Sequence, residues 1–317
     1  MKKLVLLLAV VGALLLVACS SDDSSSDDAA TSEDSTPSPG SSEEETSTTE
    51  PAEPVDQTSP AGANGIKVDE AGDLWIAVLE GDEILRVEAE SGEILQRVVT
   101  PPGSGPDDLV IDAGTVYWTG FLDGTVGSFE AAEEDGTPAA QVPLANVGNG
   151  ANPIAVRDDG VLVVGRAVVA SGLYAVEREE GAEPTEIGDP GPINSFDISP
   201  DGVLYGPLPG PGAGVVAVDP ETGEVQEHIA VPGAAFGVRW FEDQLYVLSL
   251  ADGAASVFTV DQATGEATLF GATDLDIADN LAVAQDGTVY VTGFDAPTVS
   301  VLSSDGELLP SLTIGAG

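Results

Sequence analysis

The sequence predicts an all-β protein, a six-bladed β-propeller of four-stranded antiparallel blades. Three observations predict it: units of similar length repeat six times, each unit holds short apolar strands between glycine-containing turns, and no helical period competes with them. The units open at NGIKV, DDLVI, NPIAV, NSFDI, FGVRW and DNLAV, which begin at residues 64, 107, 152, 194, 236 and 279. Their start-to-start spacings of 43, 45, 42, 42 and 43 residues match the length of a propeller blade.

Each unit has the same internal order. A first strand ends in a turn such as EAGD, SPDG or AQDG, a second strand rich in Val, Leu and Tyr follows, and a third strand leads to a turn such as DPETGE or DQATGE. Glycine suits these hairpin turns because it adopts a positive φ without steric cost. The last unit carries four strands of its own, so the ring closes either by packing of the first blade on the sixth or with a strand from before Asn64.

The N-terminus predicts export and lipid attachment. Lys2 and Lys3 precede an apolar run over residues 4–18, which is short for a membrane span of about 20 residues. The run leads into LVAC, which resembles the lipobox of bacterial lipoproteins. We therefore expect residues 1–18 to be a lipoprotein signal peptide and Cys19 to carry diacylglycerol and palmitate. The protein would then be extracytoplasmic and attached to the bacterial cell membrane through this lipid anchor only.

Composition divides the remaining chain in two. Residues 19–59 begin with the cysteine expected to be lipidated and continue as a Ser, Thr, Pro and acid-rich segment without Lys, Arg or aromatic residues, which predicts a disordered acidic linker. Residues 60–317 are expected to form the propeller. Because Cys19 is the only cysteine, the mature chain has no thiol for disulfides, iron–sulfur clusters, nucleophilic catalysis or zinc–thiolate sites.

Charge excludes another class of partner. The 317 residues include 55 Asp and Glu against 9 Lys and Arg, and the formal net charge is -46. Such a chain repels nucleic acids and anionic lipids, so no nucleic-acid partner is expected. The charge is typical of an exposed, soluble monomer, of a salty medium, or of a surface that concentrates divalent cations.

Two stretches carry a resemblance to a known family. NGIKVDEAGDLWIA and SPDGVLYG, together with the six-unit pattern, resemble the six-bladed propellers of the regucalcin (senescence marker protein) and gluconolactonase type, the LRE-like lactone hydrolases. The stretch VYWTGFLDGTV also looks like the YWTD repeat of lipoprotein-receptor propellers, which are binding modules without catalysis. Because one fold serves both activities, the resemblance leaves the function open.

The regucalcin resemblance implies a site at one end of the central channel. In that family the innermost strand of each blade starts at the channel mouth, so the residue two before its first apolar position projects toward the axis. Here those positions form what we call the mouth ring: Asn64, Asp107, Asn152, Asn194, Phe236 and Asp279. Five of them offer oxygen ligands, which suits a divalent cation, with calcium the first candidate. The alternative is that Asn and Asp simply cap the turns that enter the strands.

The family pattern matches only part of the ring. It implies a substrate-binding Asn in blade three and a metal-binding Asn in blade four, which Asn152 and Asn194 supply. It also implies a metal-binding Glu in blade one, and in blade five an Asp that binds metal and acts as base, but this chain has Asn64 and Phe236 there. Loss of that Asp removes a metal ligand and a general base.

We therefore predict a metal site made by Asn64, Asp107, Asn194 and Asp279. If the protein is an enzyme, Asp107 and Asp279 are the candidate catalytic residues, because either carboxylate could activate a bound water. Asn152 is the predicted contact for a small polar ligand.

Three further residues, two near the ring and one far from it, complete the expectations. Arg166 stands where the other units have small or apolar residues, so it either binds an anionic or hydroxylated ligand or pairs with an acid. Asp108 occupies a slot of mostly small or turn-forming residues, which predicts a solvated turn or a partner that supports Asp107. His228, the only histidine, falls on an outer strand, which argues against a histidine-dependent streptogramin-inactivating lyase, a His-ligated zinc site or a serine triad.

The sequence thus predicts a lipid-anchored extracytoplasmic propeller that binds a divalent cation, a small polar ligand, or both at its channel mouth. A metal-dependent sugar-lactone or ester hydrolase of the gluconolactonase type is one alternative. A non-catalytic protein-interaction module at the cell surface is the other.

Overall fold

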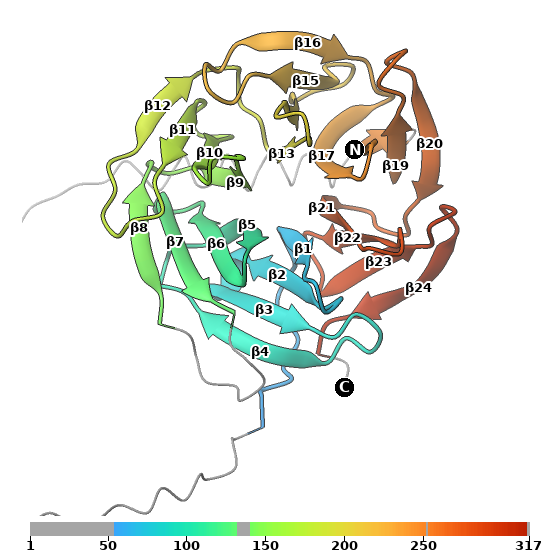
Figure 1. The fold of residues 1–317 in the computed structure, drawn as a ribbon. Helices are drawn as coiled ribbons and strands as arrows, with labels where there is room; N and C mark the ends of the chain where they lie inside the picture. Colours follow the sequence, from blue (N-terminus) through green and yellow to red (C-terminus); the bar gives the residue numbers. More distant parts are fainter. Residues whose placement is uncertain (1–53, 132–139, 252, 316–317) are drawn as a thin grey trace, which may run out of the picture. The chain divides into compact units, whose positions relative to one another are not determined.

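The computed structural model describes residues 54–131, 140–251 and 253–315. They form a ring of six blades around a central axis (Figure 1). Each blade is a four-stranded antiparallel sheet whose strands follow one another in the sequence. The predicted six-bladed propeller is therefore confirmed. The predicted signal peptide, Cys19 and nearly all of the predicted linker lie outside the described residues.

The first three blades hold strands β1 to β12. Blade 1 consists of β1 (Ile66–Val68), β2 (Leu74–Val78), β3 (Glu83–Val87) and β4 (Ile94–Val99), with a 3₁₀ turn, η1 (Leu79–Gly81), between β2 and β3. Blade 2 consists of β5 (Pro106–Asp112), β6 (Thr115–Gly120), β7 (Thr125–Glu130) and β8 (Val142–Asn146). Blade 3 consists of β9 (Ala151–Val156), β10 (Leu162–Arg166), β11 (Leu173–Val176) and β12 (Thr185–Gly188).

The last three blades hold strands β13 to β24. Blade 4 consists of β13 (Asp197–Ile198), β14 (Leu204–Pro207), β15 (Val215–Val218) and β16 (Val225–Ile229). Blade 5 consists of β17 (Ala234–Phe241), β18 (Gln244–Ala251), β19 (Ala254–Val260) and β20 (Ala267–Ala272). Blade 6 consists of β21 (Ala278–Val283), β22 (Val289–Gly293), β23 (Thr298–Leu302) and β24 (Leu308–Thr313).

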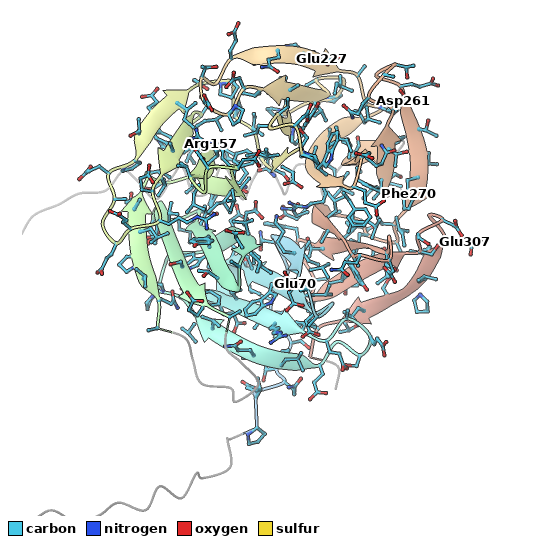
Figure 2. All side chains as sticks on the ribbon, viewed as in Figure 1. Glu70, Arg157, Glu227, Asp261, Phe270 and Glu307 are labelled. Atoms are coloured by element: carbon cyan, nitrogen blue, oxygen red, sulfur yellow. The ribbon has the colours of Figure 1, made fainter. Side chains whose placement is uncertain are left out.

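The hydrophobic core lies in the seams between neighbouring blades. The second strand of each blade is mostly buried, as in β2, whose five residues are all buried, so these strands are mainly apolar. Trp75 of blade 1, for example, packs in one cluster with Leu109 and Val116 of blade 2. Acidic side chains such as Glu227 and Glu307 lie on the outer edge of the ring (Figure 2). No helix of the described part of the chain is long and apolar enough to cross a membrane.

The ring closes by direct packing of blade 6 on blade 1. The Thr292 hydroxyl donates to Asn64 O at 2.6 Å, and Ala63 N donates to Gly293 O at 3.2 Å. The Thr119 hydroxyl of blade 2 donates in the same way to Asn152 O of blade 3. The closing seam thus repeats a contact used between consecutive blades. In the described residues the sheet of blade 6 contains only its own strands, β21 to β24.

A short segment before blade 1 adds side-chain contacts instead of a strand. The Gln57 amide accepts from Ile94 N at 2.9 Å and donates to Ile94 O at 2.8 Å, so it satisfies one peptide group on the open edge of β4. Arg97 of β4 donates to Asp56 O at 2.7 Å. These contacts hold the chain against the outer strand of blade 1 where it enters the propeller.

Candidate functional site

The mouth ring lies where the sequence predicts it, at the start of the inner strands, and four of its residues form two hydrogen-bonded pairs. Asn64 Nδ2 donates to Asp107 Oδ1 at 3.2 Å, and Asn152 Nδ2 donates to Asn194 Oδ1 at 3.1 Å. Asn64, Asp107 and Asn152 are only 4%, 5% and 6% exposed. Asn194 is half-buried. These side chains bond to one another across the blades, and Asn64 Oδ1 also accepts from Leu79 N at 3.3 Å, whereas a turn cap would bond to backbone of its own turn.

Asp107 and Asp279 are the two carboxyls of the ring, and the pKa of each is raised. Burial raises the pKa of the Asp107 carboxyl well above its usual range, and the nearby Asp279 and Asp108 carboxylates raise it further. Burial, and then Asp108, raise the pKa of Asp279 to about 7. Within the described residues neither carboxyl forms an ion pair with Lys or Arg. Asp107 is buried and Asp279 is half-buried, and in the described part of the chain neither has a compensating positive charge beside it.

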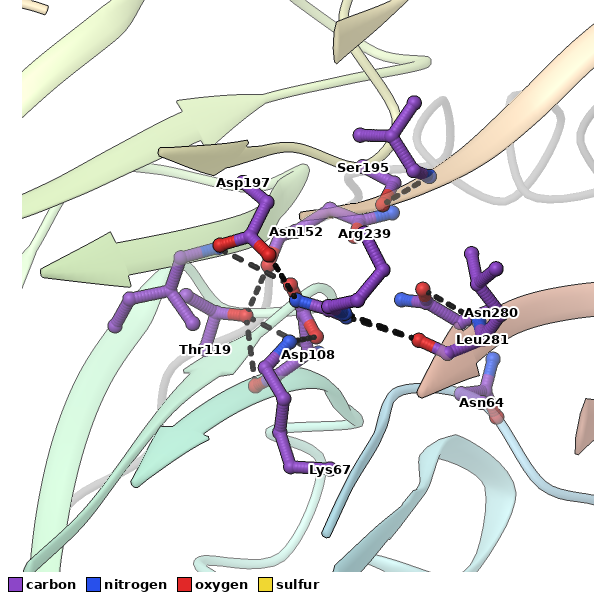
Figure 3. Close-up of polar contacts among 12 residues, drawn as sticks. Asn64, Lys67, Asp108, Thr119, Asn152, Ser195, Asp197, Arg239, Asn280 and Leu281 are labelled. Carbon is purple, nitrogen blue, oxygen red and sulfur yellow. Dashed lines mark hydrogen bonds and ion pairs between the residues drawn. The ribbon is translucent and has the colours of Figure 1, made fainter. Parts of the chain in front are cut away.

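A second layer of charge lies on the inner strands, near the axis of the ring. It consists of Lys67, Asp108, Asp197 and Arg239, which we call the four-charge layer (Figure 3). Three of these residues stand three positions after a ring residue, about 10 Å further along the strand, and Asp108 stands one position after. In blades 2, 3, 5 and 6 the ladder between the two innermost strands shifts register around the ring residue. Regular strand alternation therefore does not relate the two layers, and the register shift is what turns the ring side chains away from the ladder.

The four-charge layer is internally paired. Lys67 Nζ lies 3.5 Å from Asp108 Oδ1, and Arg239 Nη1 lies 3.6 Å from Asp197 Oδ2. Burial and the nearby Arg239 guanidinium lower the pKa of Lys67 to about 8, although Asp108 and Asp197 act in the opposite direction. Two positive and two negative groups make this layer neutral when all four are ionised.

The same side chains satisfy the inner edges of the following blades. Asp108 Oδ2 accepts a hydrogen bond from Ile154 N of blade 3 at 3.2 Å. Arg239 donates from Nε and Nη2 to Leu281 O of blade 6, both at 3.1 Å. The innermost strand of a propeller blade has no neighbouring strand on its channel side, so its peptide groups need such partners. The layer is thus part of the scaffold that fixes the mouth ring.

Sequence reasoning missed three members of this layer and misjudged the fourth. Lys67, Asp197 and Arg239 are single charges inside the otherwise apolar stretches GIKV, SFDI and GVRW, and that interruption is the signal that would have found them. The solvated-turn alternative for Asp108 is wrong, because this residue is 1% exposed. It is buried between Lys67 and the edge of blade 3. Because it directly follows Asp107 in the chain, these contacts also hold the backbone of Asp107 in place.

Two predicted residues stand apart from the ring's contacts. Arg166 lies at the end of β10 and donates from Nε and Nη2 to Asn149 O at 3.1 and 2.9 Å, so its partner is a backbone carbonyl and not the acid considered above. Phe236 is half-buried and packs against the hydrophobic cluster between blades 5 and 6. Where the gluconolactonase resemblance implies an Asp in blade five, this chain has a phenylalanine that contributes to packing.

The ring's donor set limits the kind of metal site it could form. Among the described residues no three His, Cys, Asp or Glu side chains come together in a way that could hold a metal ion. An ion at the mouth would therefore be held by the two carboxylates of Asp107 and Asp279, asparagine carbonyls and water. Such an all-oxygen set suits calcium or magnesium and not zinc.

His228 lies on β16, the outermost strand of blade 4, and is exposed. The prediction that the only histidine lies away from the channel is confirmed.

No protein-family model and no curated protein matches the sequence. Solved structures with a similar fold include virginiamycin B lyase from Staphylococcus aureus, with 15% identity, a TM-score of 0.57, and coverage of 80% of this chain and 85% of the lyase. Kuenenia stuttgartiensis hydrazine synthase has 17% identity, a TM-score of 0.57 and 79% coverage of both chains. A gluconolactonase from Xanthomonas campestris has 16% identity, a TM-score of 0.50, and coverage of 82% of this chain and 88% of the enzyme.

At these identities the similarity shows the fold alone. A catalytically inactive histidine-to-alanine variant of the Staphylococcus lyase has been solved with quinupristin, whereas the only histidine of the present chain lies on an outer strand. The comparisons therefore place this protein among six-bladed β-propellers whose structural neighbours include a gluconolactonase and a virginiamycin B lyase.

Proposed function

We propose that this protein is a lipid-anchored extracytoplasmic binding propeller whose mouth ring takes up a divalent cation, calcium first, between Asp107 and Asp279. The observation that supports this most directly is a buried and a half-buried carboxyl, Asp107 and Asp279, without a cationic partner among the described residues. Asn64 donates from Nδ2 to Asp107 at 3.2 Å, and its Oδ1 accepts from Leu79 N at 3.3 Å, so this amide would have to turn over to give its oxygen to a cation. Calcium binds carboxylate, amide carbonyl and water oxygens together.

Charge balance supports the same proposal. The four-charge layer below the ring is neutral, so Asp107 and Asp279 leave two negative charges uncompensated when both are ionised. Two protons or one divalent cation would neutralise them. Because the pKa of Asp279 lies at about 7, the proton on Asp279 is lost near neutral pH, and a cation can then supply the counter-charge.

The same mouth would also take a small polar ligand. Asn152 and Asn194, which bond to each other at 3.1 Å, offer further amide donors and acceptors on the other side of the ring. A ligand hydroxyl group could insert into this pair, because each amide keeps an unused donor and acceptor site.

Calorimetric titration with calcium tests the cation site. The soluble propeller, beginning at residue 54, should bind one calcium ion, and the double variant Asp107→Asn with Asp279→Asn should lose at least tenfold in affinity. The double variant Asp305→Asn with Glu307→Gln, at two exposed positions of blade 6, removes the same charge and should change the affinity less than twofold. Absence of calcium and magnesium binding at pH 8, which is above the pKa of about 7 of Asp279, would refute the proposal.

A second candidate function is metal-dependent hydrolysis of a sugar lactone or ester. One observation favours it: an acid with a pKa of about 7 is suited to general base catalysis near neutral pH. Phe236 weighs against it because it removes the base that the gluconolactonase resemblance implies. Turnover of simple aldonolactones that stops with chelator and with Asn194→Ala would support it. Calcium binding without any turnover would leave the binding propeller, and absence of both would leave a protein-interaction module.

The lipid anchor is supported by the LVAC stretch and is tested separately. Metabolic labelling with an alkyne analogue of palmitate should mark the full-length protein and not Cys19→Ser, which should be found in the medium or periplasm. Equal labelling of the two would contradict the anchor.

A further inference from the structure

One position of the repeat places an aromatic side chain in the seam toward the next blade. This position directly follows the first Val or Leu of the second strand. In four blades it is tyrosine: Tyr117, Tyr205, Tyr246 and Tyr290. Each ring packs in the seam with residues of the following blade. These tyrosines therefore allow four seams of one molecule to be compared directly.

Two of these rings are covered by a side chain of the next blade. The Arg178 guanidinium of blade 3 lies 4.8 Å from the centre of the Tyr117 ring, and its Nη1 lies 2.6 Å from Asp112 Oδ2. The Trp240 ring of blade 5 stacks on Tyr205 with 5.2 Å between the ring centres. Tyr, acid and guanidinium thus form a complete cation–π arrangement in the seam between blades 2 and 3.

The seam between blades 5 and 6 has a tyrosine ring, Tyr246, and nearby acids, but no arginine or tryptophan of the next blade is placed over that ring in the described residues. Beside Tyr246 lies a pocket of about 380 Å³. The acids around it are Glu242, Asp243 and Asp286, and its other lining residues are Phe241, Gln244, Gln285 and Gly287. None of the three acids forms an ion pair within the described residues. By comparison, the 170 Å³ pocket between blades 3 and 4 contains a cation of the chain itself, Arg157.

Strand register identifies which residue of blade 6 corresponds to Arg178. Val176 pairs with Leu162 at the start of β10, and Leu302 pairs with Val289 at the start of β22. Two residues beyond these partners stand Arg178 in blade 3 and Ser304 in blade 6. A Cβ atom at Gly287, which lines the pocket, would come within 3.0 Å of Ser304 Cβ, so the serine lies beside the pocket. The short side chain leaves open the space that the arginine occupies in the sister seam.

The charges around the pocket favour a cation. Asp286 accepts a hydrogen bond from Thr288 N, and such bonds hold the pKa of its carboxyl below the usual range, so it is ionised at neutral pH. Burial, and then the nearby Glu242 carboxylate, raise the pKa of the Tyr246 hydroxyl, which shows that this acid acts on the ring side of the pocket. Phe270 covers Tyr246 edge-on from the same blade at 5.4 Å, so the ring is fixed in place.

We propose that the pocket between blades 5 and 6 binds a guanidinium group from outside the chain, such as an arginine side chain, over the Tyr246 ring and between Glu242 and Asp286. The molecule itself displays the bound arrangement in the seam between blades 2 and 3, where Arg178 fills it. A flat guanidinium suits the site because it stacks on an aromatic face and bonds to carboxylates at its edge. This site is separate from the channel mouth and does not depend on the proposed cation site.

The test uses N-acetyl-arginine amide as the probe, with N-acetyl-citrulline amide as its uncharged counterpart of nearly equal shape. Binding to the calcium-free soluble propeller is measured by NMR titration. The arginine probe should bind and the citrulline probe should bind at least fivefold more weakly. Equal binding of the two would overturn the proposal, because it would show that the positive charge is not recognised.

Variants locate the binding. Glu242→Gln with Asp286→Asn should weaken binding of the arginine probe at least fivefold, whereas Asp201→Asn, at the matching turn of blade 4, should change it less than twofold. Tyr246→Phe keeps the ring and should keep binding. Unchanged binding in the Glu242 and Asp286 double variant would contradict the site.

Ser304→Arg tests the internal analogy. The introduced arginine should occupy the pocket, abolish binding of the probe and raise the melting temperature, as Arg178 fills the sister seam. Probe binding that is as strong in Ser304→Arg as in the parent would contradict the proposed location. A peptide with arginine between neutral residues distinguishes the sources: binding tighter than that of the amide supports a protein partner, and equal binding supports a small guanidinium compound. Both results support the site.

Discussion

Both layers contain aspartates near the axis of the ring, but among the described residues those of the four-charge layer are paired with a cation and those of the mouth ring are not. In the four-charge layer, Asp108 has a lysine partner 3.5 Å away, and its other oxygen accepts a peptide N–H. In the mouth ring, Asp107 is the preceding residue and equally buried, yet its side-chain partner is the neutral amide of Asn64. Of these two adjacent residues, Asp108 thus stabilises the scaffold, whereas Asp107 has no charged partner among the described residues and is the one proposed to bind a ligand.

The difference shows why composition alone is a poor guide to a site. A paired buried charge stabilises the ring only together with its partner, whereas an unpaired one destabilises it until a proton or a cation arrives. Four experiments sharpen or break this distinction between the layers.

The largest effect is expected in the paired layer. Asp108→Ala leaves Lys67 buried without its counter-charge and should lower the free energy of unfolding by about 3 to 5 kcal/mol. Urea denaturation at pH 7 measures it. The double variant Lys67→Met with Asp108→Leu should recover most of this loss, because it removes both charges. A loss below about 1 kcal/mol in Asp108→Ala would mean that the pairing contributes little.

The next effect is a pH dependence of the cation-free protein. The pKa of Asp279 is about 7 in the folded state against an ordinary value of 3.8, so the folded state binds the proton more tightly than the unfolded chain does. Stability from this group is fully present below pH 4 and is lost as the pH rises to about 7. The loss is at most on the order of 4 kcal/mol, at about 1.4 kcal/mol per pKa unit.

Urea denaturation from pH 4 to 8 without metal, compared with Asp279→Asn, isolates this contribution. Calcium should restore the stability of the parent protein at pH 8 and not that of the variant. Lys67 acts in the opposite sense, because its pKa falls from 10.5 to about 8: its share of the stability rises between those values. A parent protein and a variant with identical pH profiles would contradict the unpaired state of Asp279.

A gain of function is expected at the ring position that lacks an acid. Phe236→Asp adds a third carboxylate to the mouth and should increase calcium affinity about tenfold, equivalent to about 1.4 kcal/mol. Phe236→Leu is the matched control for lost packing, since it removes the ring without adding charge. If both variants bind calcium equally, blade five does not face the cation.

The smallest effect is expected at Arg166. Its side chain bonds to a backbone carbonyl outside both layers, so Arg166→Gln should change calcium affinity less than twofold and stability by about 0.5 kcal/mol or less. A change of tenfold in calcium affinity would show that this guanidinium contributes to the electrostatics of the mouth.

Much of the fold and part of the site were predictable. The six units, their turns and the start of each inner strand follow from the repeat, and so do the positions of Asn64, Asp107, Asn152 and Asn194 in one ring. The bonds between the two pairs were not predictable. They depend on which residues of neighbouring blades meet across the channel, a relation that no local pattern contains.

The amino-acid sequence by itself determined the blade count, the strand order and the residues at each channel position, because a blade is a local unit whose alternation and turns are written in about 43 consecutive residues. Only the tertiary structure decided which charges are paired. Lys67 meets Asp108 and Arg239 meets Asp197 across blade boundaries, whereas the buried Asp107 and the half-buried Asp279 have no cationic partner in the described part of the chain. The physical reason is that charge pairing depends on distance and burial in the closed ring, and residues about one blade apart in sequence come within a few ångströms only there.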